Sequence, residues 1–442
     1  MCYNRAEKDV IAKMRIRLIL CAIVLLILAS CSQSVGDPLT TPPETGAVTL
    51  KVWAWRGNYN GEALRIAYEH YKRANPDISI DIANIGRDEI LSRLRIKLSI
   101  KDYDGLPDIV LIEDYHIQEF LRKFPGEIRA LSPALNRGTY ERCAEEAVSL
   151  DGVMYGTPLD SGAAVMFYRV DSIEAAGYSA QDMEDLTWDK YIEIGKAVKE
   201  KTGMLMLTLT PTDLWQIRLM LQSAGQWYVK DDGVTVNLAD NPVLKDAINT
   251  YISIVKSGIA LQVSGYDQEY SAVDEERVAT VLTGSWRFQL MASIANANEG
   301  KWAITRIPRM DIHDSVNSSA LGGYAWYILD KAENADVALD FLLSTLQSDM
   351  DLINELAGEL ALVYPLKDAG DLPEYSKPYD SFYGSPTLKD LFEIIKDVPP
   401  VDYGMHTYQI DRLIEHSVQL IMQGVNIDDA LQNAQMAAEA IT

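Results

Sequence analysis

The strongest constraint on the fold is a regular alternation of two apolar periodicities that begins at Val48. A period of two predicts strands, and spacings of three and four residues predict helices with one buried face. Strand-like segments near 48–54, 78–82 and 109–112 alternate with helix-like segments near 64–71, 90–98 and 117–124. This βαβαβα order predicts a parallel sheet with right-handed connections, and hence an α/β fold.

Ligands of such sheets bind beyond the carboxyl ends of the strands. The rule points to two short segments, one after the first strand and one after the third. Trp55 could also pack against its loop, and Asp114 could cap the following helix, so both alternatives stay open. The ligand-binding candidates from this edge are Trp55, Arg56, Asn58, Glu113 and Asp114.

The N-terminal segment has the pattern of an export signal. Arg15 and Arg17 precede twelve apolar residues, Leu18 to Ala29, which suits a signal peptide better than a membrane span. The run ends in Leu-Ala-Ser-Cys31, which resembles the bacterial lipobox. We therefore predict a signal peptide over 1–30, lipidation of Cys31, a flexible tether over 31–47, and anchoring on the outer face of the cell membrane. The alternative is a short uncleaved anchor.

Composition and charge exclude several classes of protein. The 442 residues are 48% hydrophobic and carry a net charge of −24, so the chain is globular and a nucleic-acid partner is not expected. The four cysteines form no CxxC and the five histidines are scattered, so we expect neither a metal site nor a cofactor. No GxSxG, HExxH or P-loop is present, and we expect no enzyme activity. Paired carboxylates of a glycan-acting enzyme remain an alternative.

Several short motifs, weak individually, occur in an order that resembles family 1 extracellular solute-binding proteins, the substrate receptors of ABC-type sugar importers. They span nearly all of the chain from Val48 to Thr442. They are Asp151-Gly-Val-Met-Tyr-Gly-Thr-Pro158, Tyr168-Arg-Val-Asp171, Thr187-Trp-Asp189, Gly284-Ser-Trp286, Lys301-Trp-Ala303, Gly322-Gly-Tyr-Ala-Trp326 and Ile427-Asp-Asp-Ala-Leu431.

The resemblance implies a two-lobe periplasmic-binding-protein-like fold with a mostly parallel sheet in each lobe and a hinge between them. We expect one lobe from 48–157 plus 300–372 and the other from 158–299 plus 373–442. The chain would cross between the lobes near residues 157, 299 and 372. A monomer would capture a sugar by lobe closure and deliver it to the permease subunits of an ABC transporter.

Carbohydrate binding needs aromatic plates for the C–H faces of the sugar ring and polar groups for its hydroxyl rim. Further candidates for these roles are Asp160, Trp215, Trp286, Tyr324 and Trp326, where Trp215 and Trp326 have core packing as the alternative. Trp53, Trp188 and Trp302 are expected in the core or between the lobes. A polyamine is the alternative ligand, because aromatics and carboxylates also bind cations.

The chain departs from the family pattern at two places. Leu360 to Pro365 replaces a Gly-x-Leu-Pro-Thr run, and Tyr364 is expected to reshape one wall of the cleft. His406 and Tyr408 lie where some sugar-binding members have a tryptophan. Both departures bear on which ligand is bound.

Overall fold

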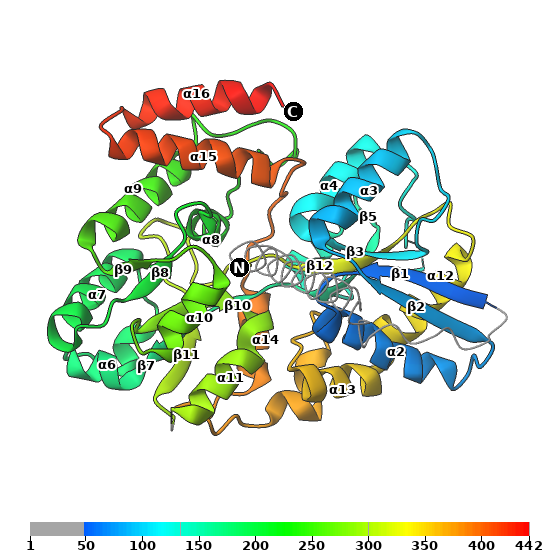
Figure 1. Cartoon of the computed structure of the whole chain (residues 1–442), viewed down its shortest axis with the longest axis horizontal. Coiled ribbons are helices and arrows are strands. Elements are labelled where there is room, and N and C mark those ends of the chain that lie inside the picture. The colour runs from blue at the N-terminus through cyan, green and yellow to red at the C-terminus, as the bar shows by residue number, and fades with distance from the viewer. Residues whose placement is uncertain (1–47, 133, 299, 442) are drawn as a thin grey trace, which may run out of the picture. The chain divides into compact units, whose positions relative to one another are not determined.

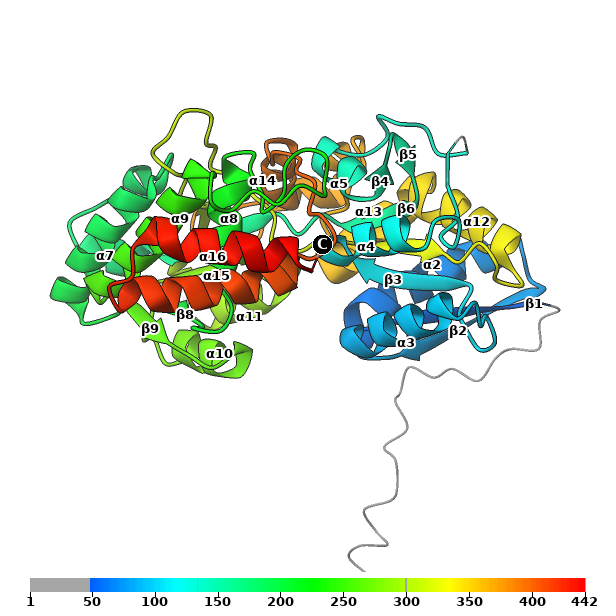
Figure 2. The ribbon, with the colours of Figure 1, turned by 90° about the horizontal axis from the view of Figure 1, so that it is seen from above.

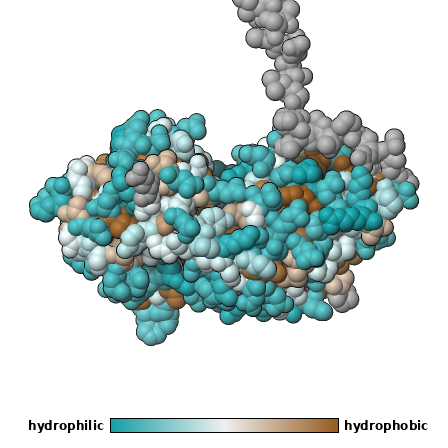
Figure 3. Space-filling model, turned by 90° about the horizontal axis from the view of Figure 1, so that it is seen from below, coloured by the Kyte–Doolittle hydropathy of each residue, from teal (hydrophilic) through white to brown (hydrophobic). Residues whose placement is uncertain are grey.

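The computed structural model describes residues 48–132, 134–298 and 300–441. The predicted signal peptide, the tether and Cys31 lie outside these residues. In the described part of the chain, no helix has the length and apolar character that crossing a membrane requires. Figure 3 shows one face of the molecule, which is mostly hydrophilic with scattered apolar patches.

The first sheet has five strands in the order β2-β1-β3-β12-β6. They are β1 (Val48–Ala54), β2 (Ile78–Asn84), β3 (Ile109–Glu113), β6 (Gly156–Asp160) and β12 (Tyr324–Ile328). As predicted, β1 pairs parallel with β2 and β3. β12 returns from far along the chain and pairs antiparallel with both β3 and β6.

Helices flank this sheet and complete what we call the first lobe (Figure 1). They are α2 (Glu62–Lys72), α3 (Arg87–Ser99), α4 (Asp114–Lys123), α5 (Arg142–Ala147), α12 (Ala335–Leu342), α13 (Met350–Leu360) and α14 (Leu388–Lys396). A short hairpin of β4 (Ser149–Leu150) and β5 (Val153–Met154) precedes β6. The three predicted strand–helix repeats therefore form as expected.

The second lobe contains a three-stranded sheet in the order β10-β7-β11 and a two-stranded sheet, β8-β9. The strands are β7 (Ala164–Arg169), β8 (Leu207–Leu209), β9 (Ala260–Gln262), β10 (Thr280–Gly284) and β11 (Trp302–Arg306). β7 is antiparallel to both of its neighbours, whereas β8 and β9 pair parallel. The mostly parallel sheet that the family resemblance implied for this lobe is therefore wrong.

The helices of the second lobe are α6 (Val170–Ala175), α7 (Trp188–Thr202), α8 (Trp215–Ser223), α9 (Pro242–Ser257), α10 (Tyr266–Asp274), α11 (Phe288–Ala297), α15 (Thr407–Met422) and α16 (Ile427–Glu439). Thr187 caps α7, since its side chain accepts from the backbone N–H of Lys190. The last two helices, α15 and α16, lie side by side along this lobe (Figures 1 and 2).

Strand pairing places β11 in the second lobe. β11 pairs with β7 although residues 300–372 were expected in the first lobe. The chain therefore returns to the first sheet only between β11 and β12. Helix α14 contacts α5 of the first lobe, and Arg306 of β11 donates to the backbone carbonyl of Glu393 on α14. Residues 161–163 connect β6 of the first sheet with β7 of the second lobe.

The alternation in β7 shows how the core is divided. Val165 and Phe167 belong to an apolar cluster that continues into the first lobe, whereas Met166 and Tyr168 face a second cluster within the second lobe. A strand with both faces buried reads as a continuous apolar run. This short strand therefore anchors the second lobe to the body of the protein.

Candidate functional site

A cleft of about 640 Å³ lies between residues of the two lobes. The first lobe contributes residues from the ends of β1 and β3, the start of α3 and the start of β12. The second lobe contributes residues from α8, α10, α11, α15 and the short turn before α11. The lining residues are Trp55, Arg56, Arg87, Glu113, Tyr115, Asp213, Trp215, Arg218, Tyr266, Trp286, Arg287, Leu290, Leu321, Gly322, Tyr324 and Tyr408. This volume suits a small organic ligand.

Glu113 is the central polar group of the first-lobe wall. It ends the fully buried strand β3 at the predicted edge of the sheet. The guanidinium of Arg87 donates to Glu113 Oε2 at 2.8 Å, and the hydroxyl of Tyr408 donates to Oε1 at 2.9 Å. Since Tyr408 comes from α15, this carboxylate connects the two lobes. Burial raises the pKa of Tyr408, so its hydroxyl stays a donor at neutral pH.

Asp160 joins the lobes behind the cleft wall. Its Oδ1 accepts from the backbone N–H of Gly162 at 2.7 Å and from the hydroxyl of Ser285 at 3.3 Å. Its Oδ2 accepts from the hydroxyl of Tyr324 at 3.5 Å. Burial raises the pKa of Asp160 to about 6 despite these bonds. Tyr324 in turn meets Trp55 edge-on, with 6.0 Å between ring centroids.

Arg56 follows β1 in a strained backbone conformation. Its φ of 53° and ψ of 60° are left-handed, a region that a non-glycine residue adopts only when its surroundings impose it. The guanidinium carbon lies 4.6 Å from the ring centroid of Trp286 in the other lobe. Arg56 lines the cleft, and among the residues that the structure describes no carboxylate lies at ion-pair distance from it.

The second-lobe wall is aromatic. Trp215 begins α8, and Trp286 lies in the turn Ser285–Arg287 just after β10. Tyr266 meets Trp286 edge-on at 6.1 Å. The indole of Trp286 folds back so closely over Gly284 that a β-carbon there would collide with it. The indole therefore lies across the glycine.

A buried arginine supports this wall. Arg218, on α8, pairs with Asp213 at 3.2 Å and with Asp411 of α15. Its guanidinium carbon lies 5.4 Å from the ring centroids of both Tyr115 and Tyr408. Charge inside the cleft is therefore largely paired before any ligand arrives.

The cleft brings together six of the ten predicted ligand-binding residues. These are Trp55, Arg56, Glu113, Trp215, Trp286 and Tyr324. Trp53, Trp188 and Trp302, which were expected to pack, are buried.

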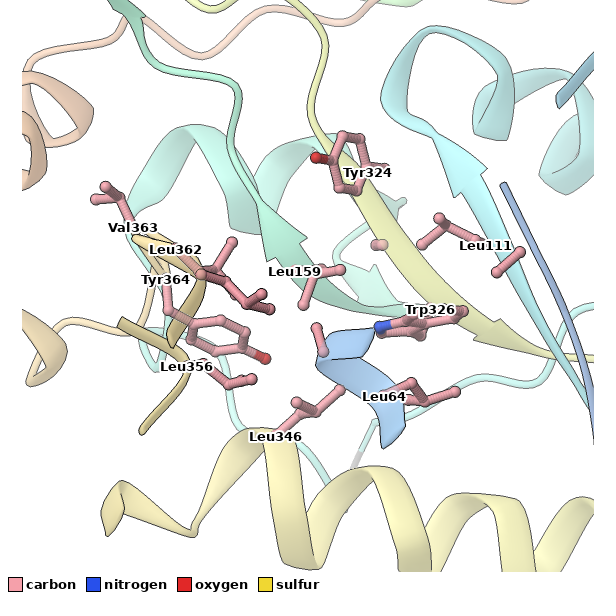
Figure 4. Packing of buried hydrophobic residues seen from close by; sticks show 14 of the residues in the cluster. Leu64, Leu111, Leu159, Tyr324, Trp326, Leu346, Leu356, Leu362, Val363 and Tyr364 are labelled. Carbon is pink, nitrogen blue, oxygen red and sulfur yellow. The ribbon is translucent and has the colours of Figure 1, made fainter. Parts of the chain in front are cut away.

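Four predicted contacts do not line the cleft. Trp326 lies two residues deeper along β12 than Tyr324 and is fully buried beside Leu64 and Leu111 (Figure 4). Asn58 is exposed on the π-helical turn Gly57–Gly61, and Asp160 lies behind the wall.

Asp114 is the fourth, buried as the first residue of α4. Glu113 occupies the N-cap position and Asp114 makes no capping bond, so the capping prediction is wrong. Burial raises its pKa well above the usual range.

Tyr364 does not shape the cleft as expected. It is fully buried in the first-lobe core, among side chains such as Leu159 and Leu356 (Figure 4). Its departure from the family pattern therefore changes packing and not the lining.

Ten lining residues were not among the predicted ligand-binding residues, although Tyr408 was expected to bear on which ligand is bound. Arg87 follows β2, and the rule about strand ends would have found it if applied to that strand. Those on α8, α10, α11 and α15 follow no strand of a parallel sheet, and only the tertiary fold brings them together. The ten are Arg87, Tyr115, Asp213, Arg218, Tyr266, Arg287, Leu290, Leu321, Gly322 and Tyr408.

Comparison with known proteins agrees with this geometry. The family model described as bacterial extracellular solute-binding protein matches residues 67–380. The chain belongs to this family. It is 35% identical to the lactose-binding protein of Rhizobium radiobacter, over 89% of this chain and 92% of that protein. It is 24% identical to the arabinooligosaccharide-binding protein of Bacillus subtilis, over 91% of this chain and 92% of that protein.

Solved structures show the same fold. The sugar-binding protein MalE from Xanthomonas citri superimposes with a TM-score of 0.74 at 18% identity, covering 89% of this chain and 97% of that one. At this identity the likeness concerns the fold alone. The two-lobe periplasmic-binding-protein-like architecture and the membership in family 1 are thereby confirmed. Within the described residues, no group of side chains is arranged to hold a metal ion.

Proposed function

We propose that this family member binds a neutral disaccharide or oligosaccharide in the cleft and delivers it to an ABC permease without chemical change. The observation that carries the proposal is the pairing of two unlike walls. Glu113, held by Arg87 and Tyr408, faces the cleft from one lobe, and Trp215 and Trp286 face it from the other. Hydroxyl groups need the first wall, and the C–H faces of sugar rings need the second.

Lactose is the first ligand to test, because the 35%-identical relative is named for it. Closure of the lobes would follow, since a ligand that contacts both lobes favours the state in which they meet. The three connecting stretches, near 161–163, 307–323 and 397–406, would then act as the hinge. We propose these crossings as the lobe boundaries, in place of 299 and 372.

A polyamine is less well matched to this cleft. The two carboxylates of the lining, Glu113 and Asp213, are both already paired with arginines. A polycation would have to break these pairs and approach Arg56. The charges of the cleft therefore favour a neutral ligand.

Isothermal titration calorimetry and thermal shift with lactose, arabinooligosaccharides and spermidine test the proposal. A ligand at 100 times its dissociation constant adds about 2.7 kcal/mol of stability, which a melting curve resolves. We expect a shift with a sugar and none with spermidine. A shift with spermidine alone would overturn the assignment. Chromatography after incubation with the bound sugar should show it unchanged, and new products would indicate an enzyme.

We also propose that lipidated Cys31 tethers a monomeric receptor outside the membrane. The lipobox pattern supports this part of the proposal. A Cys31→Ser variant should leave the membrane fraction while keeping its ligand affinity. Retention of that variant in the membrane would contradict lipid anchoring. Light scattering of the purified Cys31→Ser variant should give the mass of one chain, as expected for a monomer.

A further inference from the structure

We propose that Tyr266 and Leu290 form an outer subsite for one more sugar ring at the mouth of the cleft, so that the ligand is longer than a disaccharide. The inference rests on the proposed function and specifies the length of the ligand. Both residues line the cleft, yet 62% of Tyr266 and 37% of Leu290 is exposed. They therefore mark the place where the cleft opens to solvent.

The ring of Tyr266 is held in position although it is exposed. The edge-on contact with Trp286 fixes it on one side, and the guanidinium carbon of Arg287 lies 5.1 Å from its centroid. Arg287 is itself buried and bonded to Glu269, on the same helix as Tyr266, at 2.9 Å. A ring that is already oriented loses little conformational freedom when a ligand stacks on it.

The apolar surface continues outward along α10. Tyr270 lies one helical turn beyond Tyr266 and is 42% exposed. Isolated apolar residues on a surface need no explanation, but Tyr266, Leu290 and Trp286 all line the same cleft, and Tyr266 contacts Trp286 edge-on. We call these three residues the apolar strip. Because the strip is continuous with the cleft, its occupant is the same molecule that fills the cleft.

A polar partner for ring hydroxyls lies beside this strip. Asp213 lines the cleft, is exposed, and lies close enough to Tyr266 to act on it electrostatically. Its bond to Arg218 uses one oxygen, which leaves acceptor capacity on the carboxylate. The rim of the cleft therefore offers an aromatic ring, Tyr266, with a carboxylate, Asp213, beside it. The inner cleft presents the same two kinds of group.

The test measures how the affinity for sugars of two lengths changes when the aromatic ring of Tyr266 is removed. Calorimetry would measure lactose and galactosyl-lactose, and likewise arabinobiose and arabinotriose, binding to the wild type, Tyr266→Ala and Leu290→Ala. Tyr383→Ala is the matched control, because Tyr383 is also an exposed tyrosine (53%) and does not line the cleft. Circular dichroism would check that each variant is folded.

We expect the wild type to bind the three-ring sugar of at least one pair about tenfold more tightly than the two-ring sugar. Tyr266→Ala should weaken binding of the three-ring sugar more than binding of the two-ring sugar and so remove most of this advantage, whereas Tyr383→Ala should keep it. Equal loss for both lengths, or no length preference in the wild type, would overturn the outer subsite while the proposed function stands. Failure of the wild type to bind any sugar would overturn both.

Discussion

The two walls of the cleft are built in different ways. The first-lobe wall is polar, and its key residues follow the carboxyl ends of strands in a largely parallel sheet. The second-lobe wall is aromatic, and its residues lie in the first turns of helices or just before them. Hydrogen bonds depend steeply on geometry, whereas stacking tolerates small displacements. We infer that the first lobe orients the ligand and the second contributes contact area.

The largest effect should come from the polar wall. Glu113→Gln keeps the size of the side chain but removes the charge that holds Arg87 and Tyr408, and charge-assisted bonds contribute about 1.5–3 kcal/mol. We expect sugar affinity to fall about 30- to 100-fold by calorimetry. Glu119→Gln is the matched control, since Glu119 forms a comparable pair with Arg95 away from the cleft. Equal losses of sugar affinity in the two variants would show that the Glu113 pair in the cleft matters no more than the Glu119 pair outside it.

The aromatic wall should show a smaller, graded effect. Trp286→Ala removes a stacking surface and the cation–π partner of Arg56, and we expect about a tenfold loss of affinity. Trp286→Phe should recover about half of that loss in binding free energy, because it keeps an aromatic face. If the phenylalanine variant binds no better than the alanine variant, Trp286 contributes something other than a plate.

Asp160, which joins the two walls, should make the stability of the protein depend on pH. The folded state holds the proton more tightly than the unfolded chain, because the pKa of Asp160 is raised to about 6. Its contribution to the free energy of unfolding therefore falls as pH rises from about 4 to about 6 and is constant above that. Asp160→Asn should be more stable than the wild type at pH 7, on the order of 1 kcal/mol, with the difference vanishing near pH 4. Urea unfolding across this range measures it, and a pH-independent difference would contradict the assignment.

The smallest effect concerns the first lobe alone. Burial lowers the pKa of His70, but hydrogen bonds to Glu355 and Asp349 outweigh it and the pKa is raised. The ion pairs contribute fully below about pH 6.5, the ordinary histidine value, and are lost as pH rises through the raised pKa. His70→Gln should cost about 0.5 kcal/mol at pH 6 and less at pH 9. Ligand affinity should not change, and a change in affinity would show that the lobe interior and its wall are coupled.

The difference between the lobes also explains what the sequence could predict. The βαβαβα order and the position of Glu113 follow from local periodicity and a rule about strand ends, so both were accessible. Tyr324 and Trp326 share one strand and one motif, yet Tyr324 lines the cleft and Trp326 does not, because Trp326 lies two residues further along β12. Three other features depend on contacts between distant segments, so no local pattern predicts them. They are the strand direction in the second lobe, the partners of Arg218 and the exposure of Tyr266.

The bond between Glu113 and Tyr408 has a consequence for the order of events in biosynthesis. The two residues are 295 positions apart, so the ribosome must complete more than nine-tenths of the polypeptide before this bond can form. A chain that ends before Tyr408 has the acidic group but lacks the hydroxyl that holds it. The polar wall of the cleft is therefore complete only when nearly the whole chain has been made.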